Sequence, residues 1–145
     1  MKIICREIKT TDIEEFNGLM DDLSHRAANN ELLIKQLEKA IANPNMYLMV
    51  AEDIESGKLC GSMLGLVCED FCDDCRPLLY IENVVTGHNF RRMGIAKTMF
   101  EEMEKWGKEQ NINYAVLCSG LNRLEAHKFY ANIGYAEVKG FKKYL

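Results

Sequence analysis

The residues best suited to chemistry lie where an apolar run gives way to a basic turn that contains glycine. The run Ile81-Glu82-Asn83-Val84-Val85-Thr86 is followed by Gly87-His88-Asn89-Phe90 and then by Arg91-Arg92-Met93-Gly94-Ile95-Ala96-Lys97. This order predicts a strand, a tight loop and the beginning of a helix. The first turn of a helix carries amides without partners and a partial positive charge, so it can bind an anion. Small residues at Gly94 and Ala96 would let a pyrophosphate approach the backbone, and Arg91 and Arg92 would add positive charge.

A purely structural explanation of this turn stays open. Gly94 can serve only to join a loop to a helix, and the two arginines can be solvated surface residues. The sequence contains neither G-x-x-x-x-G-K-[ST] nor G-x-G-x-x-G, which excludes the two commonest phosphate loops.

Apolar periodicity predicts the elements that must hold this turn in place. Strands are expected where apolar runs are bounded by turn residues, over residues 2–8, 46–53, 58–68, 78–86 and 114–118. Four helices are expected: one over residues 10–24, a second that ends at Asn43-Pro44, a third that begins at the basic turn, and a fourth over residues 122–132. The segments 135–138 and 141–145 predict a closing antiparallel pair. This order predicts an α/β fold with helices on both faces of a mixed sheet.

A second motif, Asn122-Arg123-Leu124-Glu125-Ala126-His127-Lys128-Phe129-Tyr130-Ala131-Asn132-Ile133-Gly134-Tyr135, lies on the helix after the next predicted strand. It resembles the N-x-x-A-x-x-F-Y-x-x-x-G-[FY] helix of the GNAT superfamily of N-acetyltransferases. The basic turn resembles the acetyl-CoA pyrophosphate loop of that family, Q/R-x-x-G-x-G/A. The resemblance implies a mixed, mostly antiparallel sheet of about seven strands, with helices on both faces and a splayed pair of parallel strands.

The resemblance also implies acetyl-CoA as the co-substrate. The strands over residues 81–86 and 114–118 would separate at their ends, and the pantetheine arm would pair with backbone groups between them. Amides near Val84 and Val85 would polarise the thioester carbonyl. Asn122 would cap its helix and touch the cofactor, although capping alone would explain it. The expected cofactor-binding residues are Val84, Val85, Thr86, Arg91, Arg92, Met93, Gly94, Ile95, Ala96, Lys97 and Asn122.

Glu82 and Tyr130 are the candidate catalytic residues. Glu82 is a candidate general base, acting through a water, and a surface glutamate is the alternative. Strand alternation would place Tyr80, Glu82 and Val84 on one side, so Tyr80 is a second candidate for a base or a substrate contact. The resemblance places Tyr130 near the CoA sulfur, where a protonated phenol can donate to the departing thiolate. The alternative for Tyr130 is a core aromatic beside Phe129.

Two further groups of residues are candidates for binding roles. His25 and Arg26 lie between the first two predicted helices, a segment that lines the acceptor site in the resembled family, so both are candidate substrate contacts. Surface or packing roles are the alternative. Cys72 and Cys75, with Cys68 nearby, form a C-x-x-C motif, but no second pair completes four metal ligands, so no metal site is expected.

Composition limits the function classes. A chain of 145 residues with 48% hydrophobic residues predicts one domain over residues 1–145. A net charge of −4 gives no general reason to bind nucleic acid. No apolar run has membrane-spanning length and no signal peptide is recognised, so a cytoplasmic protein with reduced cysteines is expected.

These observations predict an N-acetyltransferase that moves an acetyl group from acetyl-CoA to a primary amine, by direct attack in a ternary complex. A small molecule is the expected acceptor, for example a polyamine, an amino sugar or an aminoglycoside. The alternatives are acetylation of a protein N-terminus or lysine, a catalytically silent acyl-CoA-binding regulatory module, and a metal sensor built on the cysteine loop. A homodimer is a further expectation, because dimers are frequent in proteins of this resemblance.

Overall fold

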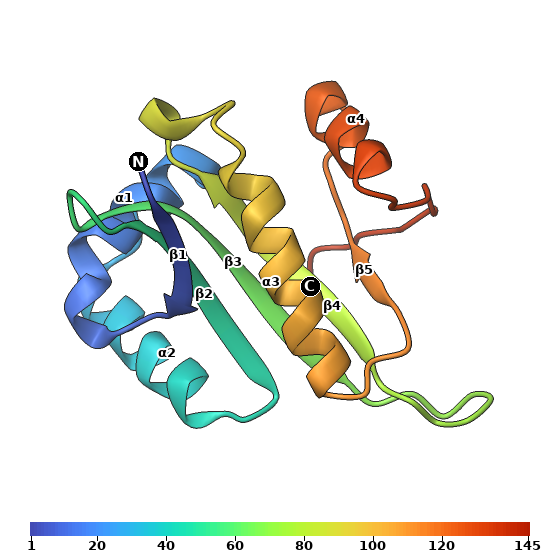
Figure 1. The fold of residues 1–145 in the computed structure, drawn as a ribbon. Coiled ribbons are helices and arrows are strands. Elements are labelled where there is room, and N and C mark those ends of the chain that lie inside the picture. The colour runs from blue at the N-terminus through green and yellow to red at the C-terminus, as the bar shows by residue number, and fades with distance from the viewer.

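A five-stranded sheet in the order β1-β2-β3-β4-β5 forms the centre of the structure, a computed structural model that describes residues 1–145 (Figure 1). Neighbouring strands are antiparallel from β1 to β4, and β5 is parallel to β4. Each strand coincides with an apolar run of the sequence. The strands are β1 (Ile3–Glu7), β2 (Met46–Asp53), β3 (Lys58–Cys68), β4 (Leu78–Thr86) and β5 (Ala115–Leu117).

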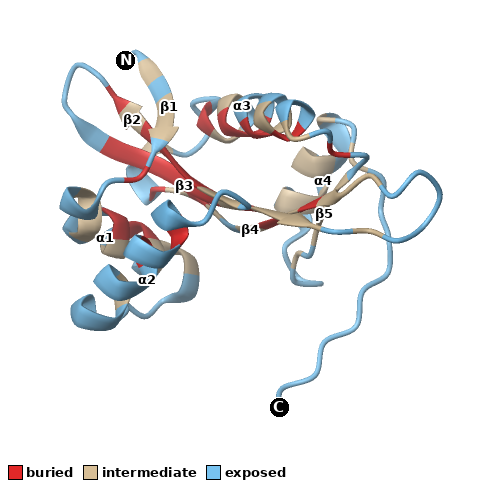
Figure 2. Cartoon of the chain, turned by 90° about the horizontal axis from the view of Figure 1, so that it is seen from below, coloured by how far each residue is buried: buried red, intermediate tan, exposed pale blue.

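Helices cover both faces of this sheet, as the sequence predicts. In Figure 2, α1 and α2 lie on one side, and α3 and α4 lie on the other. None of these helices combines the length and the apolar character needed to span a bilayer. The helices are α1 (Ile13–Ser24), α2 (Asn30–Ala42), α3 (Ile95–Glu109) and α4 (Leu124–Asn132), with short 3-10 turns η1 (Thr10–Asp12) and η2 (His88–Phe90).

The core has two layers because alternate residues of each strand point to opposite faces. On β2, Met49 packs in the layer under α3, and its neighbour Val50 packs in the layer under α1 and α2. The apolar stripe of α3 is buried as predicted, with Ile95, Met99, Phe100 and Met103 all inaccessible to solvent or nearly so.

Glycines on β3 allow α3 to approach the sheet closely. A Cβ atom at Gly65 would lie 2.5 Å from Met103 Sδ, and one at Gly61 would lie 2.8 Å from the Val85 carbonyl oxygen. Larger residues at either position would push α3 away from the sheet. These two glycines therefore fix the height of α3 above β3 and β4.

The predicted closing strand pair is wrong, and the sheet has five strands rather than about seven. Residues 133–145 form no helix or strand, and Val138, Phe141 and Tyr144 are 68%, 89% and 85% exposed. A two-stranded hairpin is marginal unless it packs on a further strand or helix. The only adjoining strand, β5, has three residues, too few to support a pair of strands over residues 135–145.

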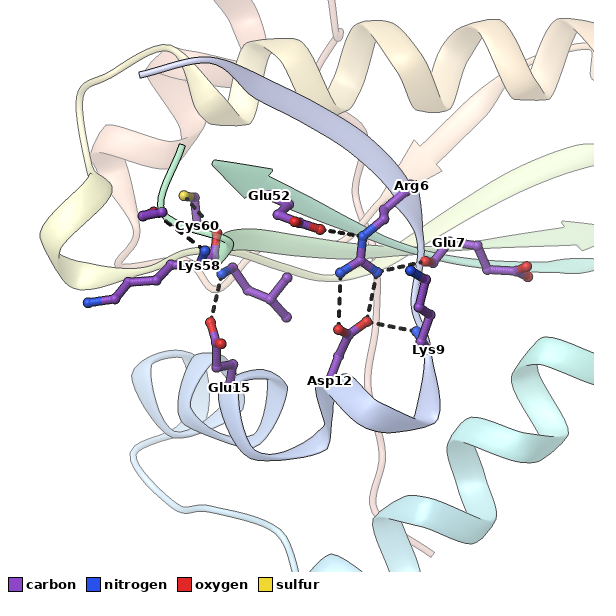
Figure 3. A network of polar contacts seen from close by, with 10 residues as sticks. Arg6, Glu7, Lys9, Asp12, Glu15, Glu52, Lys58 and Cys60 are labelled. Carbon is purple, nitrogen blue, oxygen red and sulfur yellow. Dashed lines mark hydrogen bonds and ion pairs between the residues drawn. The ribbon is translucent and has the colours of Figure 1, made fainter. Parts of the chain in front are cut away.

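A charged network fixes the beginning of α1 against the sheet (Figure 3). The Arg6 guanidinium on β1 donates to both carboxylate oxygens of Asp12, at 2.7 and 3.0 Å, and also to Glu52 on β2. Asp12 accepts a further hydrogen bond from the Lys9 amide at 2.8 Å. Nearby, Glu15 of α1 accepts from the Leu59 amide of β3 at 2.8 Å. The network therefore joins β1, β2, β3 and α1.

We expect Asp12→Asn to lower the free energy of unfolding by about 1–3 kcal/mol, because it leaves a partly buried guanidinium without its bidentate partner. Burial alone would raise the pKa of Asp12, but the hydrogen bonds from Arg6 and Lys9 outweigh burial and lower it. The stabilisation is thus complete above the pKa of an unfolded aspartate and is lost as the pH falls through the lower, folded value. Urea unfolding at several pH values measures both effects.

Glu14→Gln is the matched control, because Glu14 is an exposed acid two residues further along with no hydrogen-bond partner. An equal loss of stability in both variants would assign no special role to the Arg6–Asp12 pair.

Candidate active site

A β-bulge interrupts β4 at Asn83. Residues Leu64 and Ser62 of β3 pair with Glu82 and Val85 of β4, so Met63 alone opposes two residues of β4. Asn83 takes a left-handed conformation with φ 51°, which asparagine accepts more readily than most residues. The extra residue bends β4 and increases its local twist.

The bulge corrects the prediction that Glu82 and Val84 share a side. Glu82 lies opposite Leu64, which packs against the layer under α1 and α2, so Glu82 and Tyr80 face that layer. Val84 packs instead against the layer under α3. An extra residue in the strand shifts the alternation by one position, and alternation alone does not reveal where this happens.

Beyond the bulge, β4 and β5 are no longer paired. Their parallel ladder covers only Leu79–Ile81 and Ala115–Leu117, as the predicted splayed pair requires. A cavity of about 110 Å³ opens where the strands separate. It is lined by Leu23, Ile81, Glu82, Asn83, Val84, Leu117, Cys118, Ser119, Arg123 and Tyr130.

The basic turn presents a continuous row of amides at the beginning of α3. Phe90 N donates to Gly87 O at 2.8 Å and Thr98 N donates to Gly94 O at 3.1 Å, but no amide from Arg91 to Lys97 donates a hydrogen bond within the chain. Gly94 is the N-cap, with φ 80°, and a Cβ atom there would meet nothing within 4 Å. The row therefore has no partner within the chain and lies at the positive end of α3, which suits a diphosphate.

Aromatic packing positions Tyr130 at the cavity. Its ring lies 5.8 Å from the Phe100 ring of α3 and 5.6 Å from the Phe129 ring, in edge-to-face arrangements. Burial raises the pKa of Tyr130, and the charge of Arg123 opposes that shift. The phenol thus keeps its proton at neutral pH and can donate a hydrogen bond into the cavity.

Tyr80 does not line the cavity, but it lies beside Glu82 and Cys118, which do. The Cys118 side chain, followed by burial and by the Glu82 carboxylate, raises the pKa of Tyr80. Tyr80 is therefore protonated at neutral pH and is a poor general base there. Glu82 therefore remains the candidate general base on β4, because a protonated phenol cannot take up the proton of an incoming ammonium.

Several cavity residues were missed from the sequence. Cys118 and Ser119 directly follow β5, and Ser119 Oγ is buried without a hydrogen-bond partner. Leu23 comes from the last turn of α1. The predicted order of elements already placed the end of β5 beside β4. The polar character of Cys118 and Ser119, directly after β5, was therefore the sequence signal that could have identified them as site residues.

Other predicted residues do not line the cavity. His25 is the C-cap of α1, with φ 58° and its amide bonded to Asp21 O, and both His25 and Arg26 are exposed. Asn122 is not the N-cap of α4, because Arg123 has that position and the helix begins at Leu124. The reason is a turn over residues 120–123, where Arg123 N donates to Gly120 O at 3.0 Å.

No metal centre is assembled by the cysteines or by other ligands. Cys72 and Cys75 are exposed in the loop between β3 and β4. The structure brings together no group of three or more His, Cys, Asp or Glu side chains that could hold a metal ion. A hollow on the outer face of α3 is lined only by charged residues of that helix and offers no enclosed site: Glu101, Glu104, Lys105, Lys108 and Glu109.

Residues 10–135 match the model of the acetyltransferase (GNAT) family. The chain belongs to this family. The match covers both motifs and every element from η1 to α4, and it confirms the interpretation of the protein as an acyltransferase.

Relatives of this acetyltransferase act on different kinds of acceptor. Aminoglycoside N(6')-acetyltransferase type 1 of Serratia marcescens is 22% identical over 79% of this chain and 74% of its own length. The N-terminal acetyltransferase B complex catalytic subunit naa20 of Schizosaccharomyces pombe is 24% identical over 90% of this chain and 69% of its own length. The aminoglycoside acetyltransferase AAC(6')-Iy, solved with a bisubstrate analogue of CoA and acetylneamine, superposes with a TM-score of 0.84 at 18% identity, over 100% of this chain and 98% of its own.

We expect Gly94→Glu to abolish CoA binding measured by calorimetry. A side chain at φ 80° is strained, and its carboxylate would stand before the amide row and repel a diphosphate. Gly57→Glu is the matched control, because Gly57 has φ 69° and no neighbour within 4 Å, but lies in the turn between β2 and β3. Normal CoA binding by Gly94→Glu would exclude the amide row as the phosphate site.

Proposed function

We propose that this acetyltransferase transfers an acetyl group from acetyl-CoA to a primary amine of a small molecule, by direct attack in a ternary complex. The observation that carries the proposal is the row of unpartnered amides from Arg91 to Lys97, beside the gap between β4 and β5. The row suits the diphosphate of CoA, and the gap suits its extended pantetheine arm.

At the phosphate end, the binding residues are those of the basic turn and the first turn of α3. Their backbone amides donate to phosphate oxygens, and the exposed Arg91, Arg92 and Lys97 add positive charge. Met93, Gly94, Ile95 and Ala96 contribute through the backbone. Asn122 is retained as a cofactor contact at the turn before α4.

At the thioester end, the free edge of β4 receives the pantetheine amides as an added strand would. Val84, Val85 and Thr86 supply that edge after the ladder with β5 ends at Ile81. Ser119 Oγ, which has no partner within the chain, can pair with the same arm. An amide of this edge polarises the thioester carbonyl as the amine attacks.

Two residues of the cavity move the protons. Glu82 accepts a proton from the incoming ammonium, directly or through a water, so that a neutral amine attacks the thioester. Tyr130, on the other side of the cavity, donates its phenol hydrogen bond to the departing thiolate. Tyr80 keeps its proton and contacts the acceptor.

The acceptor enters on the face that carries α1 and α2, where Tyr80 and Glu82 point. Leu23 lines the cavity from α1, and His25 and Arg26 follow it at the beginning of the exposed connection to α2. The carboxylate of Glu82 and the net charge of −4 attract a cationic amine. The similarity to aminoglycoside acetyltransferases favours a small amine of this charge.

Acetylation of a protein N-terminus is the second candidate, because the similarity to naa20 covers 90% of this chain. Release of CoA thiol from acetyl-CoA, measured with a panel of polyamines, amino sugars, aminoglycosides and peptides with free N-termini, separates the two. We expect kcat/KM for the best small amine to exceed that of every peptide by at least about tenfold. A peptide as best acceptor would assign the second function, and CoA binding without thiol release from any acceptor would indicate a silent module.

We expect Tyr130→Phe to lower kcat by about tenfold or more while leaving the Kd of acetyl-CoA nearly unchanged, because only the hydrogen bond to the thiolate is lost. Tyr135→Phe is the control, because Tyr135 packs on the same Phe100 ring at 5.5 Å and its buried hydroxyl has no hydrogen-bond partner. Steady-state kinetics and calorimetry measure the two constants. Equal turnover in Tyr130→Phe would remove Tyr130 from the acid role.

A further inference from the structure

We propose that Lys142, in the C-terminal segment of residues 136–145, is an acetyl acceptor for the active site of its own chain. The inference deepens the proposed function, on which it rests, by naming an acceptor within the molecule. The proposed function would stand without it.

The C-terminal segment lies on the acceptor side of the sheet. It leaves α4 near β5, crosses behind β5 in Figure 1, and runs on the side of the sheet that carries α1 and α2 in Figure 2. Tyr80 and Glu82 point to that same side. The segment belongs to no helix or strand, so its path is held by few backbone hydrogen bonds.

A close contact ties the segment to the cavity. A Cβ atom at Gly140 would lie 3.4 Å from Cys118 Sγ, so the backbone of the segment passes against Cys118. Cys118 lines the cavity together with Glu82 and Tyr130. Lys142 follows Gly140 by two residues, a span of at most about 7 Å of chain, so its long side chain can reach toward the cavity that Cys118 lines.

The charge of the Lys142 ammonium is complementary to that of the Glu82 carboxylate, which lines the cavity. The Tyr144 side chain, and also the Glu82 carboxylate, raise the pKa of Lys142. The Lys142 ammonium lies 4.7 Å from the centre of the Tyr144 ring and is otherwise exposed, so no ion pair withdraws it from the site. The Glu82 carboxylate thus favours the charged form of Lys142, as it would favour an incoming ammonium.

The transfer is balanced with acetyl-CoA as the only co-reactant. Glu82 takes one proton from the Lys142 ammonium and passes it to solvent. The neutral nitrogen forms a bond to the acetyl carbon, and the bond from that carbon to sulfur breaks. The second proton leaves the nitrogen as the thiolate is protonated with the help of Tyr130. The products are N-acetyl-Lys142, CoA thiol and one proton.

The test incubates the full-length protein with acetyl-CoA and no added amine, and maps acetyl groups by peptide mass spectrometry. We expect Lys142 to gain one acetyl group at an initial rate at least tenfold above the rates at Lys139 and Lys143. The first-order rate constant should not change with protein concentration, because the acceptor belongs to the same chain. Glu82→Gln should lower the rate at Lys142 at least tenfold.

Gly94→Glu gives the rate of direct chemical acetylation, because it removes the phosphate site. Lys143→Arg should keep the modification of Lys142, and Lys142→Arg should abolish the single fast adduct. Modification of the three lysines at the Gly94→Glu rate would overturn the proposal, and so would a rate constant proportional to protein concentration. The proposal would also be overturned if Lys142 stays unmodified and Lys142→Arg turns over small amines faster. Lys142 would then block the entry of small amines rather than accept the acetyl group.

The panel of free amines separates this failure from that of the proposed function. If Lys142→Arg and the unchanged protein both acetylate a free amine while Lys142 stays unmodified, only the inference about Lys142 is wrong. If no free amine and no lysine of the chain is acetylated although CoA binds, both are wrong.

Discussion

The site depends on one constraint: β4 must stay bonded to β3 while it separates from β5. The bulge at Asn83 satisfies both demands, because it adds one residue to β4 without ending the ladder with β3. A regular β4 would continue its pairing with β5 past Ile81, and the free strand edge would disappear. Asparagine is one of the few residues other than glycine that takes the required positive φ at low cost.

The amide row is held in place by contacts on both sides of the sheet. Gly87 N donates to Cys60 O of β3 at 2.8 Å, and His88 N donates to the Asp22 carboxylate of α1 at 2.8 Å. On the other face, Gly61 and Gly65 set the height of α3 through its buried methionines. The beginning of α3 is therefore positioned before any ligand arrives, which lowers the entropy lost on binding.

Most elements could be predicted from sequence, because burial imposes a period of about 3.6 on helices such as α3 and runs of strand length on β2 and β3. The turn from Arg91 to Gly94 could also be predicted, because arginines and a glycine before a helix indicate an anion-binding turn without knowledge of distant contacts. The side that Val84 faces was not, because a single inserted residue leaves the apolar pattern of β4 intact. Cys118 and Ser119 reach the cavity through a contact between strands distant in sequence, and residues 135–145 have strand-like composition without a partner that could bury them.

The two halves of the site differ in how firmly they are built. The proposed cofactor half consists of β4, α3 and the aromatic cluster of Phe100, Phe129 and Tyr130, all packed on the core. The acceptor half is bordered by exposed chain, namely the connection after α1 and the C-terminal segment. Substitutions in exposed chain cost little stability, whereas substitutions in the core cost much. Acceptor choice can therefore change without loss of the fold, which is how one scaffold can serve relatives that acetylate an aminoglycoside and a protein N-terminus.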